Sequence, residues 1–129
     1  MSEEAGKARI TEVRPTLEKA VAAFNLRAKS DPKLRDALQD VDRVVQLDVA
    51  GDAVYNFHLT NFAIDEVKDG PAEAKNVYIT TDKATLLGIF NGEVSPTTAT
   101  LQKKIRFPPP TKLMDLLLIR KLFAEAGPG

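Results

Sequence analysis

Apolar residues near the end of the chain are so dense that they predict a helix with an apolar surface on nearly every side. The stretch TKLMDLLLIRKLFA occupies residues 111–124. Projected at about 100° per residue, its eight large apolar side chains spread around most of the helical wheel. Only Lys112, Asp115, Arg120 and Lys121 interrupt them. Such a helix needs to be covered on two sides.

Two further apolar stripes at helical spacing predict helices near the start of the chain. From Pro15, apolar residues recur every three or four positions, which predicts a helix over 15–29. In the tripeptide SDP that follows, Asp31 is a candidate N-cap and Pro32 fits the first helical position. A second, shorter helix is therefore expected directly after the first.

The apolar period changes from helical to alternating at residue 43. In RVVQLDVAGDAVYNFHLTNF, apolar and polar residues alternate on both sides of Gly51-Asp52, a pair typical of a type II′ hairpin turn. Residues 63–68 can form a third strand, and VYITT at 77–81 a fourth. The middle of the chain is therefore predicted to form a sheet.

The last third of the chain predicts two short helices and one more strand. Thr81 or Asp82 can cap a helix over DKATLLGIFNG, with Gly92 where a left-handed residue is wanted. Another turn or short helix starts at 95–96. KKIRF at 103–107 reads as a fifth strand, stopped by three prolines that cannot donate to a ladder.

Antiparallel strands grouped together, with helices before and after them, predict an α+β fold. The alternating strands leave one face of the sheet available for a core. Nothing in the chain resembles a linker or an internal repeat, so we expect a single domain over residues 15–126. A flexible N-terminus is expected over residues 1–14.

Composition favours a soluble globular protein, with 43% hydrophobic and 28% charged residues. Eighteen basic residues balance eighteen acidic ones, so no net field attracts phosphates from a distance, and no nucleic-acid partner is expected. Cysteine is absent, which excludes a thiol nucleophile and a thiolate metal site. No run reaches the roughly 20 apolar residues needed to span a bilayer. We therefore expect a cytoplasmic protein without stable membrane insertion.

Residues suited to catalysis are few. His58, the only histidine, lies in register with Asn56 and Thr60 on the polar face of its strand. A catalytic histidine needs an orienting partner and a nucleophile, and no candidate pair stands out, so a surface role is favoured. The acidic residues lack the spacing of a calcium loop, and the glycines form no phosphate-binding pattern. No catalytic residue, metal or cofactor is therefore expected.

The order of these segments resembles the sterol carrier protein 2 family of lipid-transfer domains. SDPKLRDAL, VVQLDVAGDAVYNFHLT and ITTDKATLLGIFNGEVSPTTATLQKKIRF carry the resemblance, together with the last helix, over about residues 17–123. The most specific part is LLGIFNGEVSPTTA, in which Gly92 and Ala99 match the rhythm of the family. Two departures are visible: Gln102 and Pro108–Pro110 stand where the family usually has glycines.

The resemblance implies a five-stranded, mostly antiparallel sheet with helices packed on one face and an apolar cavity between them. In the family that cavity holds fatty acyl chains, acyl-coenzyme A or sterols, the last helix helps to enclose it, and the domain carries no catalytic residue. The implied ligand-binding residues are Phe57 and Leu59 on the sheet, Leu87 and Phe90 on the short helix, Phe107, and Leu113, Met114, Leu117 and Leu118 on the last helix.

Two functions account for the apolar excess of the last helix. The first is a soluble carrier of a lipid-like ligand, which acts by burial rather than catalysis. The second is an interaction or homo-oligomerisation module whose last helix docks on a copy of itself or on another protein. A variant of the first presents an isoprenoid or other lipid to a partner enzyme. An enzyme in its own right ranks last.

Overall fold

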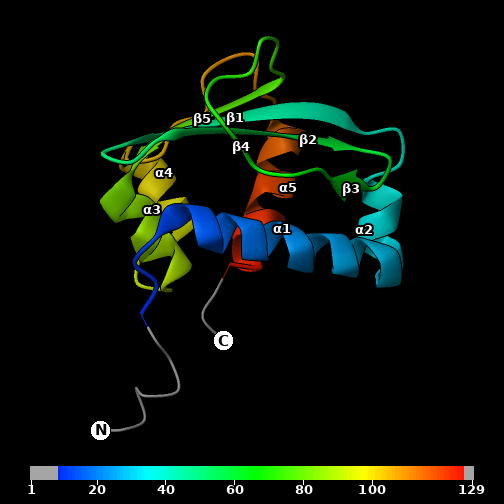
Figure 1. Cartoon of the computed structure of the whole chain (residues 1–129), viewed down its shortest axis with the longest axis horizontal. Coiled ribbons are helices and arrows are strands. Elements are labelled where there is room, and N and C mark those ends of the chain that lie inside the picture. The colour runs from blue at the N-terminus through cyan, green and yellow to red at the C-terminus, as the bar shows by residue number, and fades with distance from the viewer. Residues whose placement is uncertain (1–8, 127–129) are drawn as a thin grey trace, which may run out of the picture.

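The helices lie on one side of a five-stranded sheet in the computed structural model (Figure 1). The structure describes residues 9–126. The helices are α1 (Val13–Ser30), α2 (Pro32–Ala37), α3 (Lys83–Phe90), α4 (Pro96–Leu101) and α5 (Leu113–Ala124). The strands are β1 (Asp42–Ala50), β2 (Val54–Thr60), β3 (Ala63–Ile64), β4 (Lys68–Asp69) and β5 (Val77–Asp82).

The sheet is mixed and mostly antiparallel. Its strand order is β3-β2-β1-β5, and β4 also pairs with β2. β1 and β2 form the antiparallel hairpin that the alternating pattern predicts, with Val45 opposite Phe57. β5 returns parallel to β1, with Ile79 beside Leu47. The predicted α+β class, with helices on one face, is confirmed.

The core lies between the sheet and the helices beneath it. α1 contributes its predicted apolar stripe, and the inward-facing positions of β1, β2 and β5 meet it. The apolar face of α3 adds Leu86 and Phe90. The largest fully buried side chains are Phe24, Phe57, Phe90, Leu17, Leu38, Leu47, Ile79, Leu86 and Leu122.

The N-terminal boundary of the first helix differs from the prediction by two residues. α1 begins at Val13 rather than Pro15, because the Val13 side chain is buried in the core. Before it, Ile10 and Asn91 exchange two hydrogen bonds of 2.9 Å, which fix this segment to the end of α3. Most of the flexible N-terminus expected over 1–14 lies outside the described residues.

The predicted third strand over 63–68 is wrong as a single element. The two short strands β3 and β4 replace it, because the backbone leaves the ladder between them. The Asp65 side chain accepts a hydrogen bond from the His58 backbone N–H at 2.8 Å, where a strand would offer a carbonyl. A side-chain acceptor therefore ends the β2 pairing locally.

The predicted fifth strand over 103–107 is also wrong. The backbone N–H groups of Lys104 and Ile105 both donate to the Ala99 carbonyl and close the end of α4. Lys103 has a positive φ of 61° in this turn. Only Arg106 reaches the sheet, through a single bridge to Thr80. The amides that a strand would need are thus already used.

The predicted type II′ turn at Gly51-Asp52 is wrong in its geometry. The Val49 backbone N–H donates to the Ala53 carbonyl, so the hairpin loop holds three residues rather than two. The Asp52 backbone N–H donates back to the Val49 carbonyl at 3.0 Å. Gly51 is therefore the third residue of a four-residue turn, where its φ of 84° favours glycine.

Candidate functional site

The last helix, α5, has one face in the core and one face in solvent. Ile119, Leu122 and Phe123 are buried against the rest of the molecule. Leu113 is 74% exposed and Leu117 is 48% exposed on the other side. The second side of this helix, which the sequence leaves without cover, is therefore open within the described chain.

An open apolar groove lies beside that exposed face. It runs between α4, the segment 105–107 and α5, and its volume is about 260 Å³. Almost all of its lining is apolar. The apolar groove is formed by Pro96, Thr97, Thr100, Leu101, Ile105, Phe107, Leu113, Leu116, Leu117, Ile119, Arg120 and Phe123.

Local hydrogen bonds place the two borders of the apolar groove. Ser95 caps α4 by accepting from the Thr98 backbone N–H, and Pro96 occupies the first turn. The Thr111 hydroxyl accepts a hydrogen bond from the backbone N–H of Tyr78 at 2.7 Å and donates one to the Tyr78 carbonyl at 3.1 Å. The loop that precedes α5 is therefore fixed to β5, which sets the position where α5 begins.

A second space, which is more enclosed than the groove and is named the closed cavity, lies between the sheet, α1 and α5. Its volume is only about 10 Å³, which is about the size needed for one water molecule. The space expected to hold a ligand is thus nearly filled by the side chains that line it, among them the buried Phe24 and Phe57. Ile119 lines both this closed cavity and the apolar groove, so its side chain separates the two.

An ion pair with a buried carboxylate and a half-buried guanidinium borders the closed cavity. The Arg43 side chain on β1 donates to the Asp115 carboxylate at 2.8 Å. The other Asp115 oxygen accepts from the Lys112 backbone N–H at 2.9 Å, which caps the N-terminus of α5. This pair places two charged groups at the edge of an otherwise apolar space.

The predicted ligand-binding residues separate into several locations. Phe57, Leu59 and Leu118 line the closed cavity, whereas Phe107, Leu113 and Leu117 line the apolar groove. Phe90 is buried and packs edge-to-face against Phe123, with ring centroids 5.8 Å apart. Leu87 and Met114 line neither space, and Met114 is 67% exposed.

Sequence reasoning missed the residues that α4 contributes to the groove. Thr97, Thr100 and Leu101 line it, and Leu101 is 78% exposed. The signal available in the sequence was a leucine at the end of a short polar helix, followed by QKK. An isolated exposed leucine is common, so this signal gains meaning only from its position opposite α5.

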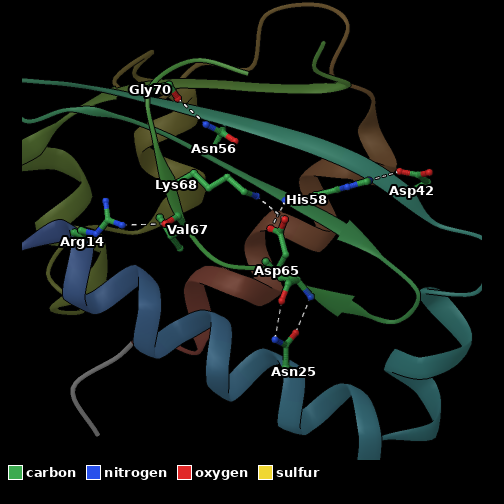
Figure 2. A network of polar contacts seen from close by, with 10 residues as sticks. Arg14, Asn25, Asp42, Asn56, His58, Asp65, Val67, Lys68 and Gly70 are labelled. Carbon is green, nitrogen blue, oxygen red and sulfur yellow. Dashed lines mark hydrogen bonds and ion pairs between the residues drawn. The ribbon is translucent and has the colours of Figure 1, made fainter. Parts of the chain in front are cut away.

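His58 lies away from both spaces, on the face of the sheet opposite the helices. Figure 2 shows it among polar side chains at the β2 edge. Its Nε2 lies 2.5 Å from an Asp42 carboxylate oxygen, and its backbone N–H donates to Asp65. Asp65 also accepts from Lys68 at 2.5 Å. The partners of His58 within residues 9–126 are therefore carboxylates and backbone groups, with no nucleophile among them.

The same network fixes the edge of the sheet to α1. The Asn25 side chain exchanges hydrogen bonds with the backbone of Ile64 at 2.8 and 2.9 Å, and Arg14 donates to the Val67 carbonyl (Figure 2). These contacts satisfy the backbone of the short strands, as buried or half-buried polar groups require. The network therefore has a structural role.

Metal clusters and spanning helices are both absent from the described part of the chain. Between residues 9 and 126, no three His, Asp or Glu side chains group closely enough to hold a metal ion. No helix in the same range is both long and apolar enough to cross a membrane.

The family of the chain follows from comparison with known proteins. The model of the SCP-2 sterol transfer family matches residues 23–113, and the protein belongs to that family. The match ends at the first residue of α5, so the helix beside the groove lies outside it. No curated protein matches the chain significantly.

Solved structures share the fold at low sequence identity. A conserved hypothetical protein from Thermus thermophilus, described as possibly a sterol carrier protein, is 17% identical with a TM-score of 0.68, and 95% of each chain is covered. Sterol carrier protein 2 from Aedes aegypti, solved with palmitate, is 19% identical with a TM-score of 0.55, covering 85% of this chain and 96% of the other. A UbiJ-SCP2 ubiquinone synthesis protein is 12% identical with a TM-score of 0.57, covering 91% and 93%.

Proposed function

We propose that this protein binds an apolar ligand of the lipid class, such as a fatty acyl chain, a sterol or an isoprenoid, and carries it through water. The observation that carries the proposal is the apolar groove beside the exposed face of α5. Membership of the SCP-2 sterol transfer family supports it. The palmitate complex of the Aedes aegypti relative supports an acyl chain as one ligand class.

Burial alone can supply the affinity. Each methylene group removed from water contributes about 0.8 kcal/mol, so a lined groove needs few polar contacts. Pockets for small molecules hold about 300–1,000 Å³. The apolar groove, at about 260 Å³, is slightly smaller than that range and would take only part of a long chain.

The remaining space would come from movement of α5. Ile119 separates the apolar groove from the closed cavity, so a shift of α5 away from the sheet would join the two. The ligand would then lie between α5 and the sheet, against Phe57, Leu59 and Leu118. In this proposal the predicted lining residues on both sides of α5 contact one ligand.

Ligand binding is tested with two leucine variants. Titration with a fluorescent fatty acid should show binding by the wild type and at least a tenfold loss for Leu117→Arg, which puts a charge in the groove. Leu26→Arg is the matched control, because Leu26 is 66% exposed on α1 and lines neither the groove nor the closed cavity. Native mass spectrometry of protein purified from cells should also show a bound mass of lipid size. An empty protein that binds no fatty acid would contradict the proposal.

The exposed face of α5 also favours a second candidate, an interaction or homo-oligomerisation module. Leu113, Met114 and Leu117 would then contact a second copy or another protein, and a partner enzyme that uses the ligand would combine the two functions. Size-exclusion chromatography with light scattering separates the candidates. The second candidate holds if the wild type is a dimer and the Leu117→Arg variant is a monomer that binds fatty acid as the wild type does.

A further inference from the structure

The apolar groove is open to solvent, and exposed leucines follow it. Leu101 on α4 is 78% exposed, and Leu113 and Leu117 on α5 are 74% and 48% exposed. All three line the groove. Leu113 and Leu117 are four positions apart, so they lie on one face of α5. The groove therefore presents a stripe of aliphatic side chains to solvent, between two helices.

The walls of the groove offer side chains but few backbone groups. α4 and α5 are helices, whose backbone amides and carbonyls mostly bond within the helix. In the segment between them, Ile105 donates to the Ala99 carbonyl, and Arg106 exchanges two backbone hydrogen bonds with Thr80. An extended peptide buried here would leave its own backbone groups without partners, which is costly. A helix satisfies its backbone internally, so the groove favours a helical occupant.

Basic side chains surround the same groove. Between residues 95 and 124 the chain has six basic residues and one acidic residue, Asp115, although the whole chain has a net charge of zero. Arg120 lines the groove, and Lys103 and Arg106 line the hollow that adjoins it. The six basic residues, all exposed, are Lys103, Lys104, Arg106, Lys112, Arg120 and Lys121.

The acidic groups nearby do not neutralise these side chains. They belong to ion pairs with arginines from other parts of the chain, which are Arg43–Asp115, Arg9–Glu93 and Arg27–Glu125. Within residues 9–126, none of the six basic side chains pairs with a carboxylate. The groove therefore favours an occupant that brings negative charge.

We propose that the apolar groove is a docking site for an acidic amphipathic helix of a partner protein. The apolar face of that helix would cover Leu101, Leu113 and Leu117, and carboxylates along its edges would meet the basic side chains. α5 spans 12 residues, about 18 Å at a helical rise of about 1.5 Å per residue, so a partner helix of about three turns would match its length. The proposal rests on the second candidate function, because it describes the partner of the same groove, and it needs no bound lipid.

Other occupants match the groove less completely. A second copy would bring two positive segments together, which is unfavourable because like charges repel. RNA would find charge but no aromatic platform for stacking, since the large exposed hydrophobic residues of the described chain are leucines and a methionine. An anionic bilayer would meet the charge, but it is flat on the scale of one helix and does not fill a concave groove.

Binding of a designed peptide tests the docking site. The probe is a peptide of about 18 residues, long enough to form an isolated helix, with leucines at i, i+3, i+4 and i+7, glutamates beside them and alanine elsewhere. One control peptide has lysine in place of every glutamate, and a second has the same composition in a scrambled order without an apolar face. Fluorescence anisotropy should show that the wild type binds the acidic peptide at least tenfold more tightly than either control. This preference should decrease at high salt.

Two charge variants of the protein locate the peptide. Replacement of Lys103 and Arg120 by glutamine should weaken binding of the acidic peptide about tenfold, because two ion pairs are lost. Replacement of the same two residues by glutamate should reverse the preference, so that the lysine peptide binds more tightly than the acidic peptide. The matched control replaces Lys19 and Lys33, which are exposed on α1 and α2, by glutamine. It should bind the acidic peptide like the wild type.

A third variant addresses the apolar contribution. Leu101→Gln should weaken binding of the acidic peptide at least threefold, with an unchanged circular dichroism spectrum. Its matched control is Leu26→Gln, which changes a leucine that is 66% exposed on α1 and should leave binding unchanged.

Four results would overturn the proposal. The first is a wild type that binds the acidic peptide no more tightly than the lysine or scrambled peptide. The second is an equal loss of binding in the groove variants and their controls. The third is binding to anionic vesicles or to RNA without binding to the acidic peptide. The fourth is a wild-type dimer that Leu101→Gln dissociates, which would support the second candidate function with a second copy as the partner.

The carrier function is measured separately, by fatty-acid titration without peptide. Peptide binding with no fatty-acid binding would support the docking site and contradict the carrier function. Fatty-acid binding with no peptide binding would have the opposite meaning.

Discussion

Arg43 on β1 donates a hydrogen bond of 2.8 Å to Asp115 in the first turn of α5. Asp115 is only 2% exposed, and its second oxygen caps the helix at Lys112. A single carboxylate thus starts α5 and joins it to the centre of the sheet. This contact fixes the end of α5 that carries Leu113 and Leu117, beside the apolar groove.

Loss of this carboxylate should loosen α5. Asp115→Ala removes a helix cap and leaves the Arg43 guanidinium half-buried without its partner, so the free energy of unfolding should fall by about 2–3 kcal/mol. Urea denaturation monitored by circular dichroism measures this change in the free energy of unfolding. The control is Glu18→Ala, which breaks an exposed pair with Arg14 and should cost under about 1 kcal/mol. Equal effects of the two variants would contradict the role of Asp115.

Ile119 separates the apolar groove from the closed cavity, so its size should control which ligands bind. Ile119→Ala should destabilise the protein by about 2–4 kcal/mol, as large-to-small changes in a core do. It should also raise affinity for long fatty acids relative to short ones, because the two spaces become continuous. Fluorescent fatty acids of different chain length measure this preference. An unchanged length profile would show that the two spaces do not combine.

Gly88 on α3 lies against Val94, which follows the helix. A Cβ added at Gly88 would lie 2.5 Å from a Val94 methyl carbon, closer than side chains tolerate. Because valine has few rotamers, Gly88→Ala should destabilise by about 1–3 kcal/mol despite the better helix propensity of alanine. Val94→Ala should restore stability in the double variant. Thermal unfolding of both single variants and the double variant measures the coupling.

Tyr55 should make stability depend on alkaline pH. Burial, and then the hydrogen bond to Asp52 at 2.5 Å, raise the pKa of Tyr55 above its ordinary value of 10.0. The folded state keeps the phenolic proton to higher pH than the unfolded chain does. The contribution of the Tyr55 proton to the free energy of unfolding is therefore complete below pH 10 and is lost as pH rises above 10.

Tyr55→Phe tests that contribution. The variant should lose less stability than the wild type between pH 9 and pH 11, because phenylalanine has no proton to release. Urea denaturation across this pH range measures the free energy of unfolding of both proteins. The titration of lysines affects both proteins equally and therefore does not contribute to the difference between them. Parallel curves for the two proteins would contradict the prediction.

Much of the fold is readable from the chain alone. The helical stripe before residue 30, the β1 and β2 hairpin and the caps Asp31 and Asp82 all match the structure. These features depend on contacts between near neighbours in sequence. Helix caps and alternating strands are local, so the residues that specify them lie within a few positions of one another.

The candidate site is harder to predict from the sequence than the fold is. The family resemblance implies a ligand in a cavity between the sheet and the helices, but side chains of the described residues nearly fill that space and a groove lies on the other side of α5. α4, which forms the opposite border, contributes Leu101, whose position opposite α5 is not visible in any local pattern. Which of two apolar faces is buried depends on packing volumes across the whole core, and these are not encoded in any short pattern.

Charge gives the clearest contrast between sequence and tertiary structure. The chain by itself determined a neutral protein with an α+β core and one helix that is too apolar for a single buried face. Only the tertiary structure decided that Arg9, Arg27 and Arg43 neutralise the acids beside α4 and α5. The partners in these pairs are at least 72 positions apart in sequence, so chain folding alone brings them together. For that reason a balanced composition yields an apolar groove bordered by basic side chains that have no carboxylate partner within residues 9–126.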